Sequence, residues 1–180
     1  AAAHDGYTWL GDVAHTVSGW RTLGYADLGW EDFYGFYAAS SPYVLFVSGN
    51  SPYQTAQQLF DAMRGDPSMK WGNAGLGSIN QLTGSLMLEK LGLKGNSVPY
   101  DGGRSAAIKV VAGEVTWSWC GLSDILDLAQ SGDIRILGIC DSSPREIDCA
   151  KGNYTVPSLL DDYPELSDLQ GLLYWGFRVS

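Results

Sequence analysis

The sequence predicts an α/β domain in which helices flank a mixed, largely parallel β-sheet. From residue 43 onwards, apolar runs of strand length alternate with helical segments of about ten residues. The 23 glycines and 7 prolines fall between these runs without a repeat, so they mark turns and not a fibrous or low-complexity chain. Strands separated by single helices need crossover connections, which place most strands parallel to one another.

The expected strands are short runs of apolar, β-branched or aromatic residues that end at turn residues. They cover residues 43–47, 69–71, 97–100, 115–119, 134–139 and 171–177, with a further candidate at 6–11. The run at 43–47 is apolar throughout and ends at Ser48-Gly49-Asn50. A continuous apolar run of this length that ends at turn residues is typical of a strand.

Two capping boxes predict the starts of the first two helices. Thr55 is followed three residues later by Gln58, and Ser78 by Gln81. The first helix is expected to end at Gly65-Asp66-Pro67, and the second before Gly92. In the second helix the apolar face is predicted to comprise Ile79, Leu82, Leu86 and Leu91. Shorter helical segments are expected at 104–112, 123–129 and 158–163.

A change of pattern divides the chain near residues 39–42. Residues 1–39 contain many aromatic residues in polar surroundings without a regular period, whereas the α/β alternation occupies residues 40–172. The last segment, residues 173–180, is predicted to be part of a strand that crosses back over this boundary.

The overall charge excludes several classes of partner. The formal net charge is −9 and the sequence pI is about 4.4, so nucleic acids and anionic membrane surfaces would be repelled. An anion can bind such a protein only through local positive potential, such as that of unpaired backbone N–H groups. The N-terminal residues lack the basic and apolar regions of a signal peptide, so a mature or trimmed form is expected.

The cysteines and histidines predict neither a metal site nor a cofactor. Cys120, Cys140 and Cys149 match no zinc spacing, and the two histidines both lie near the N-terminus. Cys140 and Cys149 flank a polar loop. In an oxidising compartment they could close this loop with a disulfide. The alternative is a buried thiol at Cys140 and an incidental one at Cys149, and both stay open.

The strongest candidate site is the glycine-containing loop between the strand at 69–71 and the helix that follows Ser78. Small residues allow the backbone to approach a ligand, and the first helical turn points unpaired N–H groups at it. The candidate ligand-binding residues are Ala74, Gly75, Leu76, Gly77 and Ser78. The loop is not a P-loop, because no Gly-Lys-Ser/Thr follows, and it lacks the third glycine of GxGxxG. The alternative is an ordinary strand–helix turn.

Three further residues are candidates near the ends of later strands. Tyr100 and Arg104 lie in and beside a second glycine-containing strand–helix turn, where Arg104 could bind a carboxylate in a bidentate manner or simply be solvated. Cys120 follows the strand at 115–119, at the end where open α/β sheets gather ligands. It is either a contact residue, a nucleophile that needs a nearby base, or a buried structural thiol.

The order and spacing of several segments resemble the tripartite tricarboxylate transporter receptors, also called the Bug family of periplasmic solute-binding proteins. The segments are Ser41-Pro42-Tyr43-Val44-Leu45-Phe46-Val47, Ser51-Pro52-Tyr53-Gln54-Thr55, residues 72–80, Val98-Pro99-Tyr100-Asp101-Gly102-Gly103 and Gly113-Glu114-Val115. This resemblance implies a type II periplasmic-binding-protein fold, with two α/β lobes and a ligand between them. It implies that residues 1–39 are a partial first-lobe segment, 40–172 the second lobe, and 173–180 a strand returning to the first lobe.

The resemblance also implies a function. Family members bind small carboxylates, often di- or tricarboxylates, and deliver them to membrane permease subunits. The protein is accordingly expected to be a periplasmic or extracytoplasmic monomer, cell-surface anchored if its source is Gram-positive, and not an enzyme.

Two departures from the family pattern modify this expectation. The family's N-terminal segment is not found in these 180 residues, so the chain is expected to be a fragment that binds carboxylates weakly or not at all. Cys120 stands where the family commonly has an aspartate. Two other functions stay open from the sequence: an α/β enzyme that uses Cys120, and the ligand-sensing module of a regulator.

Overall fold

A computed structural model of the chain describes residues 9–13, 19–21, 24–29, 32, 34–148, 152–170 and 174–179. The chain forms two compact units. One comprises residues 42–170, and the other comprises residues 1–41 together with residues 171–180. Each unit is described separately.

The larger unit contains a five-stranded sheet in the order β5-β4-β6-β3-β7. Its strands are β3 (Tyr43–Ser48), β4 (Lys70–Asn73), β5 (Asn96–Pro99), β6 (Trp117–Gly121) and β7 (Ile134–Ile139). β4 pairs in parallel with β5 and β6, whereas β3 is antiparallel to both of its neighbours, β6 and β7. Four strands therefore run in one direction and β3 runs against them. The prediction of a mixed, largely parallel sheet is confirmed.

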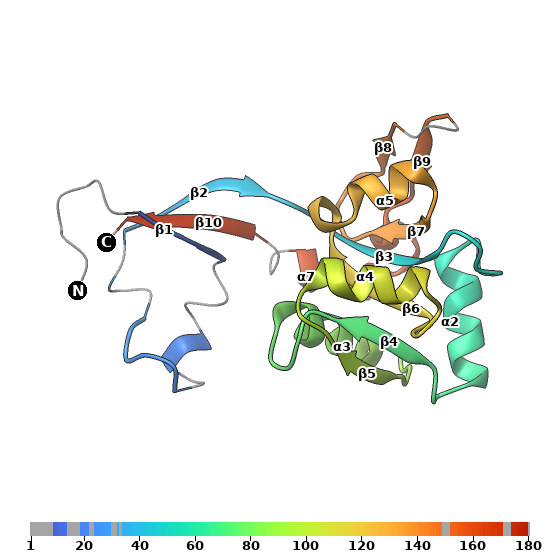
Figure 1. Ribbon diagram of the computed structural model, residues 1–180, viewed down its shortest axis with the longest axis horizontal. Helices are drawn as coiled ribbons and strands as arrows, with labels where there is room; N and C mark the ends of the chain where they lie inside the picture. Colours follow the sequence, from blue (N-terminus) through green and yellow to red (C-terminus); the bar gives the residue numbers. More distant parts are fainter. Residues whose placement is uncertain are drawn as a thin grey trace. The chain divides into compact units, whose positions relative to one another are not determined.

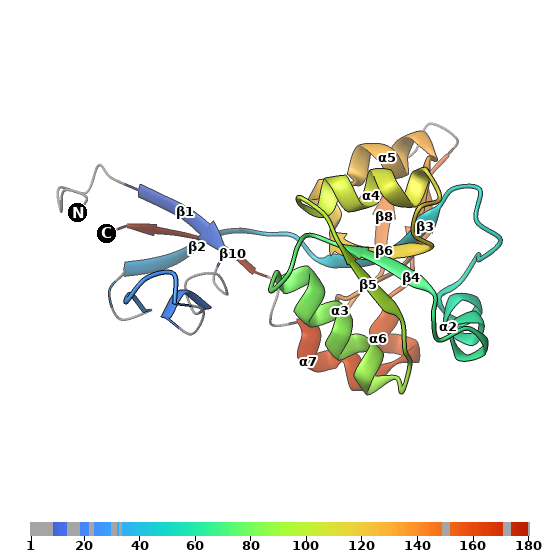
Figure 2. The ribbon, with the colours of Figure 1, turned by 60° about the horizontal axis from the view of Figure 1, so that its bottom comes forward.

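Helices cover both faces of this sheet (Figure 1). They are α2 (Ala56–Gly65), α3 (Ile79–Lys90), α4 (Gly103–Val111), α5 (Leu126–Ser131), α6 (Leu159–Asp162) and α7 (Ser167–Gln170), with 3₁₀ turns at Leu122–Asp124 and Pro164–Leu166. Figure 2 shows α4 and α5 on one face and α3, α6 and α7 on the other. The connections β4–α3–β5 and β5–α4–β6 lie on opposite faces because β6 is on the far side of β4 from β5.

The predicted capping boxes form in both helices, each with a variation. The hydroxyl of Thr55 accepts a hydrogen bond from the Gln58 N–H at 3.2 Å, and that of Ser78 accepts one from the Gln81 N–H at 3.2 Å. In return, the carboxamide oxygen of Gln58 accepts from the N–H of Gln54, one residue before the cap. Gln81 similarly accepts from the N–H of Gly77. Each glutamine thus stabilises the loop that leads into its helix.

The predicted apolar face of α3 was wrong. Leu82 is 58 % exposed, and Ile79, Leu86 and Leu91 are only partly buried. The buried residues are Asn80, Thr83, Gly84, Met87 and Leu88. These residues recur at the spacing of a helix face, but three of them are not hydrophobic, so a search for apolar periodicity misses them. In α4, Ala106, Ala107 and Val110 face the core, whereas Ile108 is 51 % exposed.

Most predicted strands are confirmed, and several elements were missed. β3 and β7 match the expected runs closely, while β4 and β6 begin one or two residues later than predicted. The polar segment after Cys140 forms a small hairpin of β8 (Arg145–Ile147) and β9 (Tyr154–Val156), which had no apolar signal. Cys140 is a buried free thiol; Cys149 lies outside the described residues.

The smaller unit contains a three-stranded antiparallel sheet in the order β1-β10-β2. β1 (Trp9–Val13) and β10 (Tyr174–Val179) lie near the two candidate strands of the sequence, whereas β2 (Tyr34–Ser40) was not predicted. The central strand is β10, so segments from both ends of the chain form one sheet. In the part of the chain that the structure describes, no helix is long and apolar enough to span a membrane.

Candidate functional site

The sheet brings the main candidate residues to one edge. β4, β5 and β6 run in the same direction, so their carboxyl ends meet there. Ala74 follows β4, Tyr100 follows β5, and Cys120 is the second-last residue of β6. The N-termini of α3 and α4 begin at the same edge, which is where ligands of open α/β sheets gather.

The loop from Ala74 to Ser78 has a conformation that needs its two glycines. Gly75 and Gly77 have positive φ angles of 117° and 74°, in a region that residues with a Cβ rarely adopt. Leu76, between them, has a negative φ and an 80 % exposed side chain. Alternation of the sign of φ turns successive backbone N–H groups in different directions. The loop therefore presents its amides to two different sets of partners.

Three of the five loop amides are bonded to the chain's own oxygens. The N–H of Gly75 donates to Asn73 Oδ1 at 3.0 Å, and that of Gly77 donates to Gln81 Oε1 at 2.7 Å. The N–H of Ser78 donates to the carbonyl of Gly75 at 3.2 Å. Gly75, Gly77 and Ser78 were expected to offer these amides to a ligand. In this conformation they shape the loop instead.

Four neighbouring amides have no acceptor among the described residues. They belong to Ala74 and Leu76 in the loop and to Ile79 and Asn80 in the first turn of α3. Unpaired N–H groups at the start of a twelve-residue helix combine with the helix dipole to attract negative charge. This arrangement can hold a carboxylate without any cationic side chain. Ile79 and Asn80 were not among the residues predicted to bind.

A buried network of hydrogen bonds holds the first turn of α3 against the sheet. The Tyr43 hydroxyl donates to Asn80 Oδ1 at 3.2 Å, and Asn80 Nδ2 donates to the Trp119 carbonyl at 3.2 Å. One turn further on, the Trp119 indole N–H donates to the Thr83 hydroxyl at 2.9 Å. Asn80 and Thr83 are 6 % and 1 % exposed. The position of the candidate site thus depends on polar side chains that are hydrogen-bonded within the chain.

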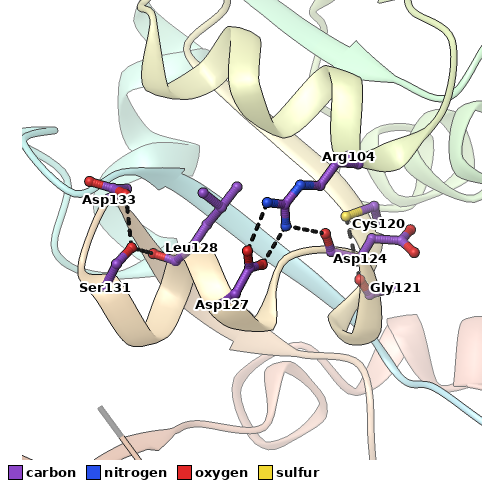
Figure 3. Close-up of polar contacts among 8 residues, drawn as sticks. All are labelled: Arg104, Cys120, Gly121, Asp124, Asp127, Leu128, Ser131 and Asp133. Atoms are coloured by element: carbon purple, nitrogen blue, oxygen red, sulfur yellow. Dashed lines mark hydrogen bonds and ion pairs between the residues drawn. The ribbon is translucent and has the colours of Figure 1, made fainter. Parts of the chain in front are cut away.

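The N-terminus of α4 already has negative partners within the chain. Arg104 forms two bonds with the carboxylate of Asp127 and a third with the carbonyl of Asp124 (Figure 3). A Cβ on Gly103, the first residue of α4, would lie 2.6 Å from Asp124 Oδ2, so this carboxylate occupies the space beside the helix start. Arg104 was a candidate carboxylate ligand, but its guanidinium is paired with Asp127. Of the two helix N-termini, that of α3 is therefore the better candidate for an anion site.

Burial makes Cys120 unsuited to nucleophilic chemistry. Its side chain is fully buried. Burial, and to a smaller extent the nearby charge of Asp124, raises the pKa of the thiol well above its usual value. Burial also raises the pKa of Asp124 itself, although Arg104 opposes the change. An activated cysteine needs the opposite environment. Cys120 therefore behaves as a structural thiol, which gives no support to the enzyme alternative.

A separate groove of about 560 Å³ lies along the other half of α3. Trp71, Leu88 and Leu93 contribute apolar side chains to it, and Ser85 and Ser97 contribute hydroxyls. Ser97 also bonds to Asn73 and Gln81, so it connects this groove with the candidate loop. Among the described residues, no group of three or more histidine, cysteine or acidic side chains could hold a metal ion.

The comparison with protein families identifies one receptor family. Residues 1–147 match the model of the tripartite tricarboxylate transporter family receptor. The chain belongs to this receptor family. Members of the tripartite tricarboxylate receptor family are extracytoplasmic solute-binding proteins, as the sequence resemblance had predicted. No curated protein matches the chain.

Solved structures of the receptor family share its fold. MatC from Rhodopseudomonas palustris, solved with bound malate, superposes with a TM-score of 0.75 at 19 % identity. A second R. palustris protein, solved with adipate, gives 0.71 at 19 %, and the periplasmic binding protein BugD gives 0.75 at 18 %. These matches cover 98 to 99 % of this chain but only 58 to 60 % of each of theirs. At such identities the likeness establishes the fold alone.

Two buried weak acids of this receptor domain, the thiol of Cys140 and the hydroxyl of Tyr43, predict a loss of folding stability at high pH. Burial raises the pKa of Cys140 from 9.0 to about 12, and it also raises the pKa of Tyr43. A proton held more tightly in the folded state stabilises the fold fully below the unfolded pKa, and this stabilisation is lost as pH rises towards the folded pKa. For Cys140 alone, the loss at pH 10.5 is about 2 kcal/mol, at 1.36 kcal/mol per pKa unit.

We therefore expect the free energy of unfolding to fall steadily above pH 9 in urea titrations under reducing conditions. The variant Cys140→Ala should have a shallower decline, because it has one fewer buried acid. Parallel pH profiles for the two proteins would show that Cys140 does not titrate differently on unfolding.

Proposed function

We propose that this chain contributes the second lobe of an extracytoplasmic receptor, and that this lobe binds one carboxylate of a small dicarboxylate at the N-terminus of α3. The observation that carries the proposal is that four amides, those of Ala74, Leu76, Ile79 and Asn80, have no acceptor among the described residues. In the whole protein, residues of a first lobe would close over the ligand. The receptor would then deliver the ligand to the membrane permease subunits of a tripartite tricarboxylate-type transporter.

The net charge supports a local mechanism of anion binding. A protein with a net charge of −9 repels anions at long range, so attraction must come from oriented dipoles close to the ligand. The two basic side chains of α4 do not supply it, because Arg104 is paired with Asp127 and Lys109 with Glu114. Malate and adipate in the related structures support a dicarboxylate as the ligand class.

A single lobe should bind such a ligand weakly. Micromolar affinity needs about 8 kcal/mol. A helix N-terminus contributes at most about 2 kcal/mol, and each charge-assisted hydrogen bond about 1.5–3 kcal/mol before the cost of ordering. With one face of the ligand still in water, we expect millimolar dissociation constants for this 180-residue chain.

The proposal can be tested by NMR titration of the chain with malate and adipate. We expect the largest amide shifts at Ala74, Leu76, Ile79 and Asn80, and no comparable shifts with sodium chloride at equal ionic strength. Shifts that scatter over the surface, or that centre on Arg104, would contradict the assignment. A micromolar dissociation constant would instead show that one lobe suffices.

A matched pair of variants isolates the contribution of one backbone amide. Leu76→Pro removes the N–H of residue 76, whereas Leu76→Ala keeps it, and both replace a side chain that is 80 % exposed. We expect Leu76→Pro to weaken dicarboxylate binding at least about ten-fold, the equivalent of one charge-assisted hydrogen bond. Leu76→Ala should bind like the parent chain. Equal weakening in both would point to the side chain.

A further inference from the structure

Two carboxamide side chains hold the candidate loop, and both are bonded to the same hydroxyl. Asn73 Nδ2 donates to Ser97 Oγ at 2.7 Å, and Gln81 Nε2 donates to it at 3.3 Å. Asn73 ends β4, Gln81 lies in the first turn of α3, and Ser97 lies in the edge strand β5. Three separate elements therefore meet at one side-chain oxygen.

The opposite ends of the same carboxamides are bonded to the loop. Asn73 Oδ1 accepts the Gly75 N–H, and Gln81 Oε1 accepts the Gly77 N–H. The NH₂ nitrogen and the oxygen of a carboxamide lie in one rigid plane, bonded to the same carbon, so an anchored NH₂ determines where the oxygen lies. A hydroxyl oxygen has two lone pairs, and those of Ser97 accept from both carboxamides.

We infer that Ser97 is a positioning residue for the ligand loop: its hydroxyl orients Asn73 and Gln81, which in turn bind the amides of Gly75 and Gly77. With these two amides turned towards the carboxamides, the alternate amides of Ala74 and Leu76 are left without a partner. A serine on an exposed edge strand thus determines which N–H groups of the loop are available. Its consequence for ligand affinity rests on the function proposed above.

Without the Ser97 hydroxyl, both carboxamides lose a fixed acceptor. Asn73 is fully buried and keeps little freedom, but Gln81 is only partly buried and can rotate into water. We therefore expect the bond to Gly77 to loosen more than the bond to Gly75. A ligand would then have to order the loop as it binds, which lowers affinity.

Amide hydrogen exchange on the ligand-free chain tests this inference directly. In Ser97→Ala we expect exchange at Gly77, and to a smaller extent Gly75, to accelerate by about two- to ten-fold, the range for loss of one net hydrogen bond. Ser97→Thr keeps the hydroxyl and should restore the slow exchange. Ser85→Ala, a serine of α3 that lines the same groove, should leave both amides unchanged.

The outcomes separate this inference from the proposed function. Unchanged exchange at Gly75 and Gly77 in Ser97→Ala, or failure of Ser97→Thr to restore it, overturns the positioning role even if dicarboxylates bind. Accelerated exchange in a chain whose amides do not respond to malate or adipate supports the positioning role and counts against the proposed function. Accelerated exchange together with weaker binding in Ser97→Ala, restored by Ser97→Thr, supports both.

Discussion

Alanine at position 84 is expected to lower the free energy of unfolding by about 1–3 kcal/mol, the typical cost of an extra carbon in a close-packed core. A Cβ on Gly84 would lie 2.7 Å from Cη2 and Cζ3 of Trp71. Trp71 is 1 % exposed and stacks on Trp117, with ring centroids 5.0 Å apart and planes at 10°. Because this stack blocks retreat of the indole, α3 itself must move away from the sheet.

The sign of this effect distinguishes packing from helix propensity. In an isolated helix, alanine is favoured over glycine by about 1 kcal/mol, so propensity alone predicts stabilisation. Gly65 is the matched control, because it also lies in a helix and an added Cβ there meets nothing within 4 Å. Urea unfolding should show a loss for Gly84→Ala and none for Gly65→Ala. If both variants gain stability, the close contact with Trp71 does not exist.

The second large effect is expected from Asn80→Ala, which should cost at least about 2 kcal/mol of stability. Removal of this carboxamide leaves the Tyr43 hydroxyl without its acceptor and the Trp119 carbonyl without its side-chain donor, both in the interior. A buried polar group that loses its partner costs about 1–3 kcal/mol. The measurement is the midpoint and slope of urea unfolding.

A double-mutant cycle with Tyr43→Phe tests whether the loss comes from the network. Tyr43→Phe keeps the ring and should cost only about 1 kcal/mol. In the Asn80→Ala background it should cost much less, because the hydroxyl no longer has its partner. Leu82→Ala, at a 58 % exposed position of the same helix, should change stability by less than about 0.5 kcal/mol. Strictly additive effects would mean that the Tyr43–Asn80 bond is unimportant.

The strands and helix starts of the larger unit followed from local patterns. The apolar run at β3 is buried throughout because strands lie on both sides of it and helices cover both faces of the sheet, which is the environment such a run predicts. Thr55 and Ser78 cap their helices because the hydroxyl-to-N–H bond spans only three residues and needs no distant partner. The strand β2 was missed because the aromatic residues of its segment follow no regular period, and the hairpin β8–β9 because its short strands carry no continuous apolar run.

The inward face of α3 was predicted wrongly, for a physical reason. Hydrophobic periodicity assumes that the core side of a helix is apolar, yet α3 buries Asn80 and Thr83 through hydrogen bonds to β3 and β6. Gly84 faces inwards because only a hydrogen leaves room for Trp71. These partners are 13 to 39 residues away in sequence, so no local window contains them.

What the sequence determined by itself is the class of fold, the starts of the capped helices and the location of a glycine-containing loop before α3. These depend on the side-chain period and on hydrogen bonds that span three or four residues. Only the tertiary structure decided which amides of that loop are available. The N–H groups of Gly75 and Gly77 are bonded to the side chains of Asn73 and Gln81, and Ser97, from a third element, accepts a hydrogen bond from both of these side chains. The tertiary structure also decided that Arg104 is paired, because its partner Asp127 is separated from it in the sequence by a strand and a turn.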